Sequence, residues 1–534
     1  MIWKRISGWS LAVLLGLTIA GFRPAAPALA QAAERELEYG EALAVWDLAA
    51  ARRAAATVPA GPRRQLYMGI VAFFEAKYKS AEELIAAALA SDSLAPGSSE
   101  RADAERYLSL TRGERRALAS ATEIRSPDGK IIAVFSSPKD TLLAPYLFDA
   151  MAKARAELGT QLGVFPDHPV RFEILDDPAK LALVTSLTTD NIYTTGTVGV
   201  TKYRRIMMIT PRVMLRGYPW LDTAVHEYVH YLLTIRTGNN APVWLHEGLA
   251  KLLETRWRTK NLAELGPASA SLLAAALKKD DLVTLDEMYP SVAMLPSQSR
   301  AALAYAEVQT MLELLVDSRG QQGLGALLDQ VAAGADSKQA LADAWGGSFE
   351  QFQAKWRQQA ARSSAKIISR AGARDFRGIE FQDPDKPAKD SGLEDVFSHL
   401  GGGKARQHAR LGVLLTVRGH HQAAVLEYER ARRADKRFRD DPRLARRLGE
   451  LYLLLGQPDK AAVLLTLAAD AEPEQPNIAA AQGRALLLIG SLEAAERALM
   501  RAIRINPFIP DIHCDLAKLA GDPEAKQREQ THCR

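Results

Sequence analysis

Residues 222–250 read DTAVHEYVHYLLTIRTGNNAPVWLHEGLA, and this stretch decides the fold that we expect. Its first half carries apolar residues at helical spacing, and the turn-forming run at 237–242 predicts where that helix ends. His226 and His230 are four residues apart, so both imidazoles lie on one helix face, one turn from each other. Two imidazoles in that arrangement can share one divalent cation.

Two glutamates complete the pattern. Glu227 follows the first histidine, so its carboxylate lies beside the metal position and can take a proton from a metal-bound water. Glu247 comes 17 residues after His230, on a second helix expected at 244–254 that the turn can fold back. Catalytic zinc takes three protein ligands and keeps one position open. We therefore expect Zn2+ to be bound by His226, His230 and Glu247, with Glu227 as the general base.

Neighbouring residues carry weaker signals. Gly248 and Ala250 permit close packing of the two helices because they have little or no side chain. His246 precedes Glu247, but adjacent side chains diverge by about 100° on a helix, so we expect it at the rim. Tyr305 is a candidate donor to a developing oxyanion, and a tyrosine packed between helices is the alternative. For the histidines, the alternative is burial with ordinary hydrogen-bond partners and no metal.

The string H-E-x-x-H followed by W-L-x-E-G-x-A resembles the gluzincins, the glutamate-zinc metallopeptidases, and most of all their peptidase MA-like group. That group is often fused to tetratricopeptide repeats. The resemblance is strong over about 200–256 and fainter to about 360. It implies an α+β, thermolysin-like metallopeptidase domain with zinc ligands His226, His230 and Glu247 and with Glu227 as the base.

The sequence departs from some gluzincins at two places. They carry an acid four residues after the third ligand to orient a histidine, but this chain has Lys251 there and Glu254 one turn further on. The partner that orients each ligand histidine is therefore unassigned. The aminopeptidase branch has an acidic residue that binds the substrate's free amine, whereas residues 196–203 (GTVGVTKY) contain no acid. This difference favours an endopeptidase.

A 34-residue repeat occupies the C-terminal part, at 405–520. Its members Gly449, Tyr452, Gly456, Ala461, Ala468 and Pro473 recur 34 residues later as Gly483, Leu486, Gly490, Ala495, Ala502 and Pro507. An earlier copy begins with Gly412, which precedes Gly449 by 37 residues. The spacing resembles tetratricopeptide repeats, whose stacked helical hairpins commonly bind peptides or proteins. A fainter copy at 31–118, with Gly69 and Ala81, predicts an N-terminal helical region, and an ordinary helical bundle is the alternative.

Between the repeats the pattern indicates an α+β domain at 125–362. Strands are expected at 130–136 and 170–175 with a helix at 147–162 between them, then a strand or hairpin at 194–211. From Pro219 to about 362 the chain reads as helical. The strand at 204–210 could bind a substrate as an added strand. A linker is expected at 363–404 and a short tail at 521–534.

The first 30 residues read as a secretory signal peptide. Lys4 and Arg5 precede an apolar run from Leu11 to Ala20, and Ala28-Leu29-Ala30 forms a cleavage site. A membrane anchor is the alternative, but the run is shorter than the roughly 20 residues that span a bilayer. We expect a periplasmic or secreted protein with no stable membrane span. Its formal charge of +5 falls to +2 without Lys4, Arg5 and Arg23, and no basic, aromatic stripe indicates nucleic acid.

The only two cysteines, Cys514 and Cys533, each follow a histidine. In an oxidising compartment a disulfide is the first expectation, and idle thiols or a second metal site with His513 and His532 are alternatives. Taken together, the sequence predicts an exported zinc metallopeptidase that acts on peptide or protein substrates and binds protein partners through its repeats. A periplasmic repeat scaffold with an inert metallopeptidase-like module is the competing hypothesis, and hydrolysis of a non-peptide bond is a third.

Overall fold

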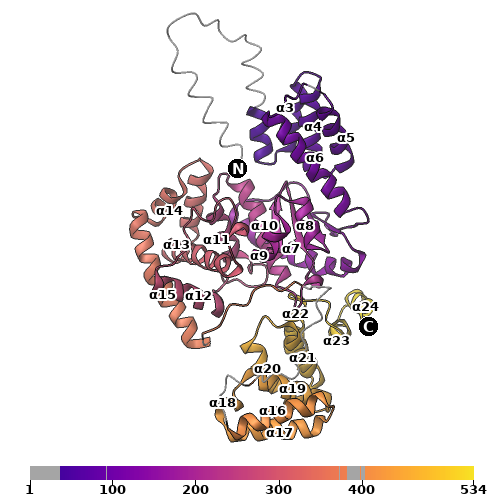
Figure 1. Cartoon of the computed structure of the whole chain (residues 1–534), viewed down its shortest axis with the longest axis vertical. Coiled ribbons are helices and arrows are strands. Elements are labelled where there is room, and N and C mark those ends of the chain that lie inside the picture. Colours follow the sequence, from indigo (N-terminus) through magenta and orange to yellow (C-terminus); the bar gives the residue numbers. More distant parts are fainter. Residues whose placement is uncertain (1–36, 92, 372, 382–396, 398–402, 534) are drawn as a thin grey trace, which may run out of the picture. The chain divides into compact units, whose positions relative to one another are not determined.

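The computed structural model describes residues 37–91, 93–371, 373–381, 397 and 403–533 (Figure 1). The signal peptide expected at 1–30 lies outside these residues, as does much of the linker expected at 363–404. The described residues fall into two compact units. Unit 1 is drawn from Met1–Ile209 and Thr223–Gly378, and unit 2 from Thr210–Asp222 and Ile379–Arg534. No helix among the described residues combines the length and the apolar character needed to cross a bilayer.

The centre of unit 1 is a five-stranded mixed sheet in the order β1-β2-β3-β5-β4. Strands β2, β3 and β5 run parallel, while β1 and β4 pair antiparallel at the two edges. The runs of β-branched and aromatic residues in the middle strands are almost wholly buried, as expected of strands covered on both faces. The bounds are β1 Thr122–Arg125, β2 Ile131–Phe135, β3 Val170–Leu175, β4 Gly199–Lys202 and β5 Arg205–Ile209.

Helices make the crossovers that parallel strands require. Helix α7 (Ala144–Leu162) joins β2 to β3, and α8 (Pro178–Val184) and α9 (Thr189–Thr195) lead from β3 to the β4–β5 hairpin. The strands expected at 130–136 and 170–175 and the hairpin expected at 194–211 are confirmed. The expectation that 204–210 could receive a substrate strand is wrong, because β5 pairs with β3 on one side and β4 on the other. The free edge on this side of the sheet belongs to β4.

The N-terminal helices belong to unit 1 and do not form a compact unit of their own. Residues 37–44 are helical, and Gly69 lets α4 and α5 approach closely, since a Cβ there would lie 2.6 Å from Ile85 Cγ1. Helix α6 reaches α8 and the sheet, and Gly113 on it contacts the Leu183 carbonyl so closely that a Cβ would lie 2.1 Å away. The helices are α3 Leu48–Thr57, α4 Pro62–Phe74, α5 Tyr78–Leu89 and α6 Ser99–Ala117.

A buried ion cluster joins these helices to the sheet. The Arg205 guanidinium at the start of β5 lies 2.7 Å from a Glu114 oxygen on α6 and 3.6 Å from a Glu173 oxygen on β3. It also donates to the Phe73 carbonyl at the end of α4 at 3.1 Å. All three charged side chains are within 1% of full burial, so each depends on the others for compensation of its charge.

The rest of unit 1 is helical, as expected from Pro219 onward. Helix α15 continues to Ala371, so its last turns lie inside the range expected as a linker. Trp356 on α15 donates to the Thr310 hydroxyl on α13 at 2.9 Å and fixes the two helices against each other. The bounds are α10 Trp220–Arg236, α11 Val243–Leu253, α12 Pro267–Lys279, α13 Gln298–Ala332, α14 Ser337–Trp345 and α15 Phe349–Ala371.

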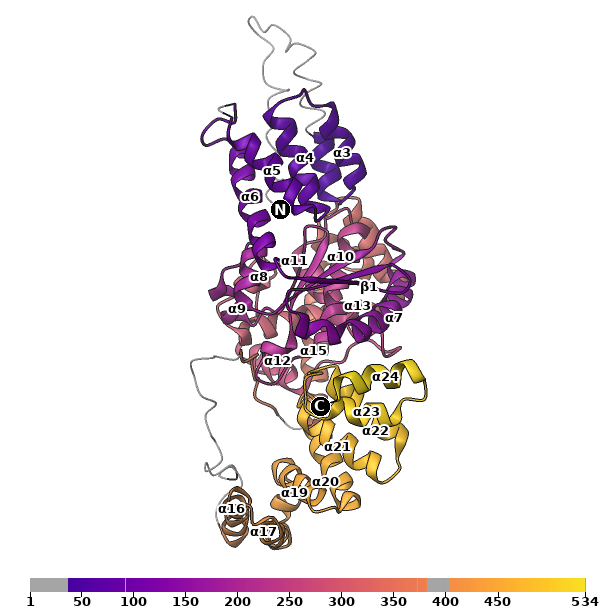
Figure 2. The same cartoon turned by 90° about the vertical axis from the view of Figure 1, so that its right-hand side faces the viewer.

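Unit 2 contains the helical hairpins that the 34-residue period predicts (Figure 2). Gly449 and Gly483 mark close helix approaches, because a Cβ there would lie 2.8 Å from Leu465 Cγ and 2.6 Å from Leu499 Cγ. The three additional residues of the first repeat are accommodated by the extra short helix α18. The bounds are α16 Lys404–Val417, α17 His421–Ala434, α18 Lys436–Arg439, α19 Pro442–Leu454, α20 Pro458–Ala471, α21 Pro476–Leu488 and α22 Leu492–Ile503.

Two more helices end the described chain, α23 (Ile512–Leu519) and α24 (Pro523–His532), so the expected tail at 521–534 contains a helix. A disulfide between Cys514 and Cys533 fastens α24 to α23. The alternative of a second metal site is therefore wrong, because both sulfurs are bonded to each other. His513 instead contacts Glu529 through Nδ1 at 2.7 Å and the Pro507 carbonyl through Nε2 at 2.8 Å.

A segment from the middle of the chain completes unit 2. Residues Thr210–Asp222 lie between β5 and the body of α10, yet they belong to this unit. The Trp220 indole is 1% exposed and donates to the Ile503 carbonyl at 2.9 Å, and the Tyr218 amide donates to the Ile505 carbonyl at 3.1 Å. The first residues of helix α10 are thus part of the C-terminal unit, and the remainder of that helix is part of unit 1.

Candidate metal centre

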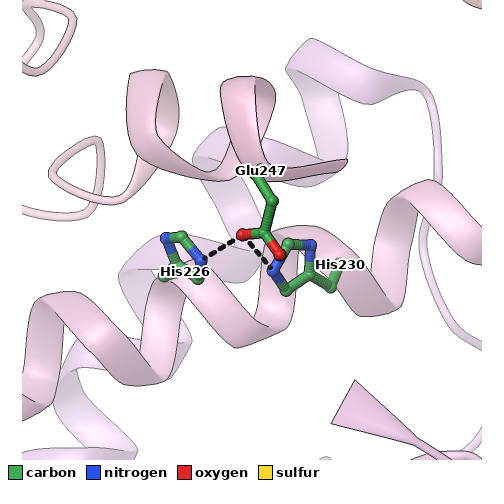
Figure 3. Close-up of side chains that lie close together, drawn as sticks. All are labelled: His226, His230 and Glu247. Carbon is green, nitrogen blue, oxygen red and sulfur yellow. Dashed lines mark ion pairs between the residues drawn. The ribbon is translucent and has the colours of Figure 1, made fainter. Parts of the chain in front are cut away.

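Helices α10 and α11 provide the predicted ligands. The turn between them uses positive φ angles at Gly238 (58°) and Asn239 (60°), residue types that tolerate this conformation. The Thr237 hydroxyl donates to the Leu233 carbonyl at 2.8 Å and closes the end of α10. The chain therefore reverses within a few residues and returns α11 across the face that carries the two histidines (Figure 3).

Three ligand atoms converge. Oε2 of Glu247 lies 3.3 Å from Nε2 of His226 and 3.4 Å from Nε2 of His230. Figure 3 shows the carboxylate descending from one helix between imidazoles that rise from the other. These three residues form the one group among the described residues whose ligand atoms lie close enough together to hold a metal ion, all within 4.8 Å. The trio predicted from the sequence is assembled as expected.

The spacing fits a tetrahedral cation. Zinc bonds of about 2.1 Å that diverge by about 109° place neighbouring ligand atoms about 3.4 Å apart, which matches both Glu247 distances. Oε2 of Glu247 is also buried without a well-formed hydrogen bond, because its contacts with the imidazoles are long ion pairs. A buried acceptor of this kind needs a partner, and a divalent cation would supply it. The residues present therefore fit zinc.

Charges in the metal-free site are mutually dependent. Burial lowers the pKa of His226, but its contacts with Glu247 and Glu254 outweigh burial and raise that pKa to about 9. Burial raises the pKa of Glu247, but the adjacent His230 and His226 hold it well below its usual range. A protonated His226 beside an ionised Glu247 places a positive charge between the same groups that would ligate a cation, so metal binding would release that proton.

Glu254 is the orienting partner that the sequence left unassigned. Its Oε2 lies 3.1 Å from Nδ1 of His226, on the ring side opposite the ligand nitrogen. Lys251 donates to both Glu254 oxygens, at 3.2 and 3.1 Å. Such a contact fixes which imidazole nitrogen faces the metal. Nδ1 of His230, in contrast, is buried without a hydrogen-bond partner among the described residues.

The close packing expected of Gly248 occurs against a different helix. A Cβ on Gly248 would lie 2.8 Å from the Val308 carbonyl on α13 and 3.0 Å from a methyl of Leu312. The glycine therefore permits α11 to approach α13 and not α10, as the sequence had suggested. This approach brings Tyr305 of α13 to the site, with its ring centroid 6.3 Å from that of His226.

Two residues with uncertain roles in the sequence now have defined surroundings. Burial raises the pKa of Tyr305 well above its usual value, and the nearby carboxylates of Glu247, Glu227 and Glu254 add to the effect, so its phenol keeps its proton. The His246 ring lies 5.4 Å from that of His230 but is not part of the ligand group. Burial and the adjacent His230 lower the pKa of His246 to about 3, so it is neutral.

Glu227 lies beside the ligand group, 5% exposed, and contacts the edge strand β4. The Thr201 hydroxyl lies 2.8 Å from Oε2 of Glu227 and 2.7 Å from its backbone carbonyl. A Cβ on Gly199 would lie only 2.6 Å from Oε1 of the same carboxylate. Sequence reasoning missed both residues, and the available signal was a glycine inside a strand pattern, which often marks a close approach.

Comparisons with known proteins identify part of unit 1. Residues 150–361 match the family model of the Peptidase MA superfamily, a range that includes all four predicted site residues. No curated protein matches the chain. The chain is similar in structure to native yeast LTA4 hydrolase, with 12% identity and a TM-score of 0.27 over 77% of this chain. It spans 66% of that protein, slightly under two thirds.

A second solved structure resembles the chain over most of its length. It is the APC/C hetero-tetramer Cut9–Hcn1, with 11% identity and a TM-score of 0.23, covering 95% of this chain and 78% of that one. The family match is the informative comparison, because it places a Peptidase MA superfamily domain at 150–361. This domain contains α10 and α11 with their converging ligand atoms.

Proposed function

We propose that this chain is a zinc-dependent peptidase, with His226, His230 and Glu247 as the metal ligands and Glu227 as the general base. The observation that carries the proposal is the convergence of three ligand atoms at tetrahedral spacing, with a non-ligating buried carboxylate next to them. The family match at 150–361 supports the same class of chemistry. When bound, zinc would polarise the scissile carbonyl and make a water molecule acidic enough to attack near neutral pH.

The side chains of the chain perform the proton transfers. Glu227 is held beside the ligand group by β4, and it takes a proton from the attacking water. The same carboxyl group then gives that proton to the departing nitrogen. Tyr305 retains its phenol proton and can donate a hydrogen bond to the carbonyl oxygen as negative charge develops there.

The sheet edge offers a place for the substrate backbone. Strand β4 is the outermost strand on the side of Glu227, and it pairs with β5 only. An extended peptide can pair with such an edge through main-chain hydrogen bonds, which gives little sequence preference. Residues 196–203 contain no acid that could bind a free amino terminus. These features support an endopeptidase.

The repeats of unit 2 are proposed to bind protein or peptide partners. Each of three hairpins ends its first helix with an exposed aliphatic side chain, at Val417 (59% exposed), Leu454 (63%) and Leu488 (59%). A recurring exposed apolar residue on stacked hairpins is a feature of surfaces that bind extended or helical segments. The proposal also includes export through the N-terminal segment at 1–30, in a periplasmic or secreted setting.

Zinc analysis and a cleavage assay test this function together. The purified full-length protein should contain one zinc per chain and cleave an unfolded protein substrate, whereas Glu227→Gln should keep zinc and lose roughly 100-fold or more of the turnover. Glu264→Gln, a change at a side chain that is 81% exposed, serves as the matched control. Absence of zinc favours the inert scaffold. Zinc without cleavage of any peptide bond favours hydrolysis of another bond.

A further inference from the structure

The contact between the β4–β5 hairpin and Glu227 has a role that the ligand motif does not include. We propose that Thr201 is a positioning residue for the general base, on a hairpin that the N-terminal helices hold in place. The inference rests on the proposed function, since it concerns the same carboxylate. It assigns the N-terminal helices a part in the reaction, through the shape of one sheet edge.

The hydrogen-bond geometry of Thr201 is specific to Glu227. A hydroxyl has one hydrogen to donate, and both acceptors within reach belong to Glu227, its Oε2 at 2.8 Å and its backbone carbonyl at 2.7 Å. No ion pair with a lysine or arginine is formed by Glu227 in the described part of the chain. A hydroxyl therefore directs the carboxylate without neutralising its charge, as a base requires.

Gly199 provides the clearance that this arrangement needs. It lies two residues before Thr201, so both positions face the same side of the strand. A Cβ on Gly199 would lie 2.6 Å from Oε1 of Glu227 and 2.9 Å from its Cγ. These are closer than real contacts, so even an alanine would displace the carboxylate. The glycine is needed for space, because its backbone is ordinary extended strand.

The hairpin is held by contacts with the N-terminal helices. Its two turn residues, Tyr203 (φ 55°) and Arg204 (φ 62°), both adopt the left-handed conformation that larger side chains avoid. The Tyr203 ring packs between Phe73, Phe74 and Tyr107, with centroids 5.2, 5.7 and 6.2 Å away. Strained turn residues persist where surrounding packing determines them, and such strain is common near active sites.

The next residue continues this anchor. Arg205 begins β5 and forms the buried ion pair with Glu114 of α6. Its guanidinium also lies 4.3 Å from the centroid of the Phe73 ring on α4. Helices α4 and α6 therefore fix the start of β5, and the two-residue turn transmits that position to β4, which carries Thr201 and Gly199.

Isosteric substitution tests the role of the hydroxyl. Thr201→Val removes the donor but keeps the shape, and we expect kcat to fall roughly 10- to 100-fold while zinc content and KM stay close to those of the unmodified protein. Thr201→Ser restores a hydroxyl and should recover most of the rate. Thr197→Val is the matched control, because the Thr197 hydroxyl pairs with Thr195 at 2.8 Å and not with the site. Unchanged kcat in Thr201→Val overturns the proposal.

A second measurement does not depend on catalysis. Melting temperatures are compared for the zinc-loaded protein, Thr201→Val, Glu227→Ala and the double variant. If Thr201 holds the carboxylate, the Thr201→Val shift is smaller in the Glu227→Ala background than in the original one. Equal shifts in both backgrounds overturn the proposal, even if no peptide substrate is cleaved. Full activity of Glu227→Gln would instead overturn the proposed function and leave the positioning contact to this melting comparison.

Discussion

Oε2 of Glu254 lies 3.1 Å from Nδ1 of His226 and orients this histidine from a position seven residues beyond the third ligand, Glu247. Seven residues are about two helical turns, so Glu247 and Glu254 lie on the same face of α11 and its C-cap. The position one turn after Glu247 is occupied by Lys251, which pairs with Glu254. The acid has thus moved one turn further along, and the lysine steadies it.

Replacing this orienting acid should weaken metal binding. Glu254→Gln removes the negative charge beside His226, and we expect zinc affinity to fall roughly 10- to 100-fold, because outer partners of ligand histidines have effects of that size. Competition with a chromogenic chelator measures the change. Glu264→Gln should bind zinc as the unmodified protein does. Equal affinity in Glu254→Gln would show that the His226 contact has no part in metal binding.

The two histidines nearest to Glu247 should differ in their effect on zinc. His230→Ala removes a ligand atom 3.4 Å from the Glu247 carboxylate, so the purified protein should lose its zinc and its activity. His246→Ala should retain zinc, because this residue lies outside the ligand group. Metal content by atomic absorption distinguishes the two variants. Loss of zinc in both would mean that His246 joins the coordination.

Removal of the metal should be reversible. A chelator should abolish peptide cleavage, and addition of zinc at one equivalent should restore it. Because a ligand that binds only the folded state stabilises it, zinc should also raise the melting temperature of the metal-free protein. Glu227→Gln should show the same rise, since this residue is not a ligand. A rise that His230→Ala also shows would place the stabilising zinc elsewhere.

The buried ion pair between Arg205 and Glu114 predicts a large effect on stability. Arg205→Met leaves Glu114 in the interior without its 2.7 Å partner and should cost about 3–5 kcal/mol of unfolding free energy. The double variant Arg205→Met/Glu114→Gln should recover part of this loss. Urea titration followed by tryptophan fluorescence measures both. If the double variant is less stable than the single one by the full effect of Glu114→Gln alone, the two residues are not coupled.

Glu307 predicts a pH dependence of stability. Burial raises its pKa to about 8, while its backbone partner Val283 and the nearby Arg300 oppose burial only in part. The unfolded chain then loses this proton near the ordinary value of 4.5 and the folded chain only near 8, so stability contributed by the group is complete below 4.5 and is lost as the pH rises to 8.

The substitution Glu307→Gln isolates this effect. Its amide oxygen can still accept the hydrogen bond from the Val283 amide, which lies 2.9 Å from the carboxyl in the unmodified protein. The difference in melting temperature between the variant and the unmodified protein should shift in favour of the variant between about pH 5 and pH 8, then level off. A constant difference across this range would show that Glu307 titrates normally.

The features that the sequence predicted well are local or periodic. The ligand histidines share one helix, and only a short turn separates them from Glu247, so spacing alone brings all three together. Strands β2 and β3 announce themselves as runs of β-branched and aromatic residues. The repeats follow from identical offsets. Strand β1 was missed because it is four residues long and half exposed, with a weak pattern.

The errors concern contacts between distant positions. Thr201 and Glu227 are 26 residues apart, and their hydrogen bond depends on which strand forms the edge of the sheet. Strand order is set by crossovers that no local pattern encodes, so β5 was taken for an accessible strand when it is an inner one. Gly248 was assigned to the wrong helix partner for a similar reason, since α13 follows it by some fifty residues.

The residues Thr210–Asp222 make the two units inseparable by any single cut of the chain. Removing the repeats at their sequence boundary would uncover the Trp220 indole at the start of the helix that carries both ligand histidines. Gene fusion or loss at that boundary could not exchange the C-terminal part as a free cassette. The protein must have been inherited, and must be refolded, as one interlocked polypeptide.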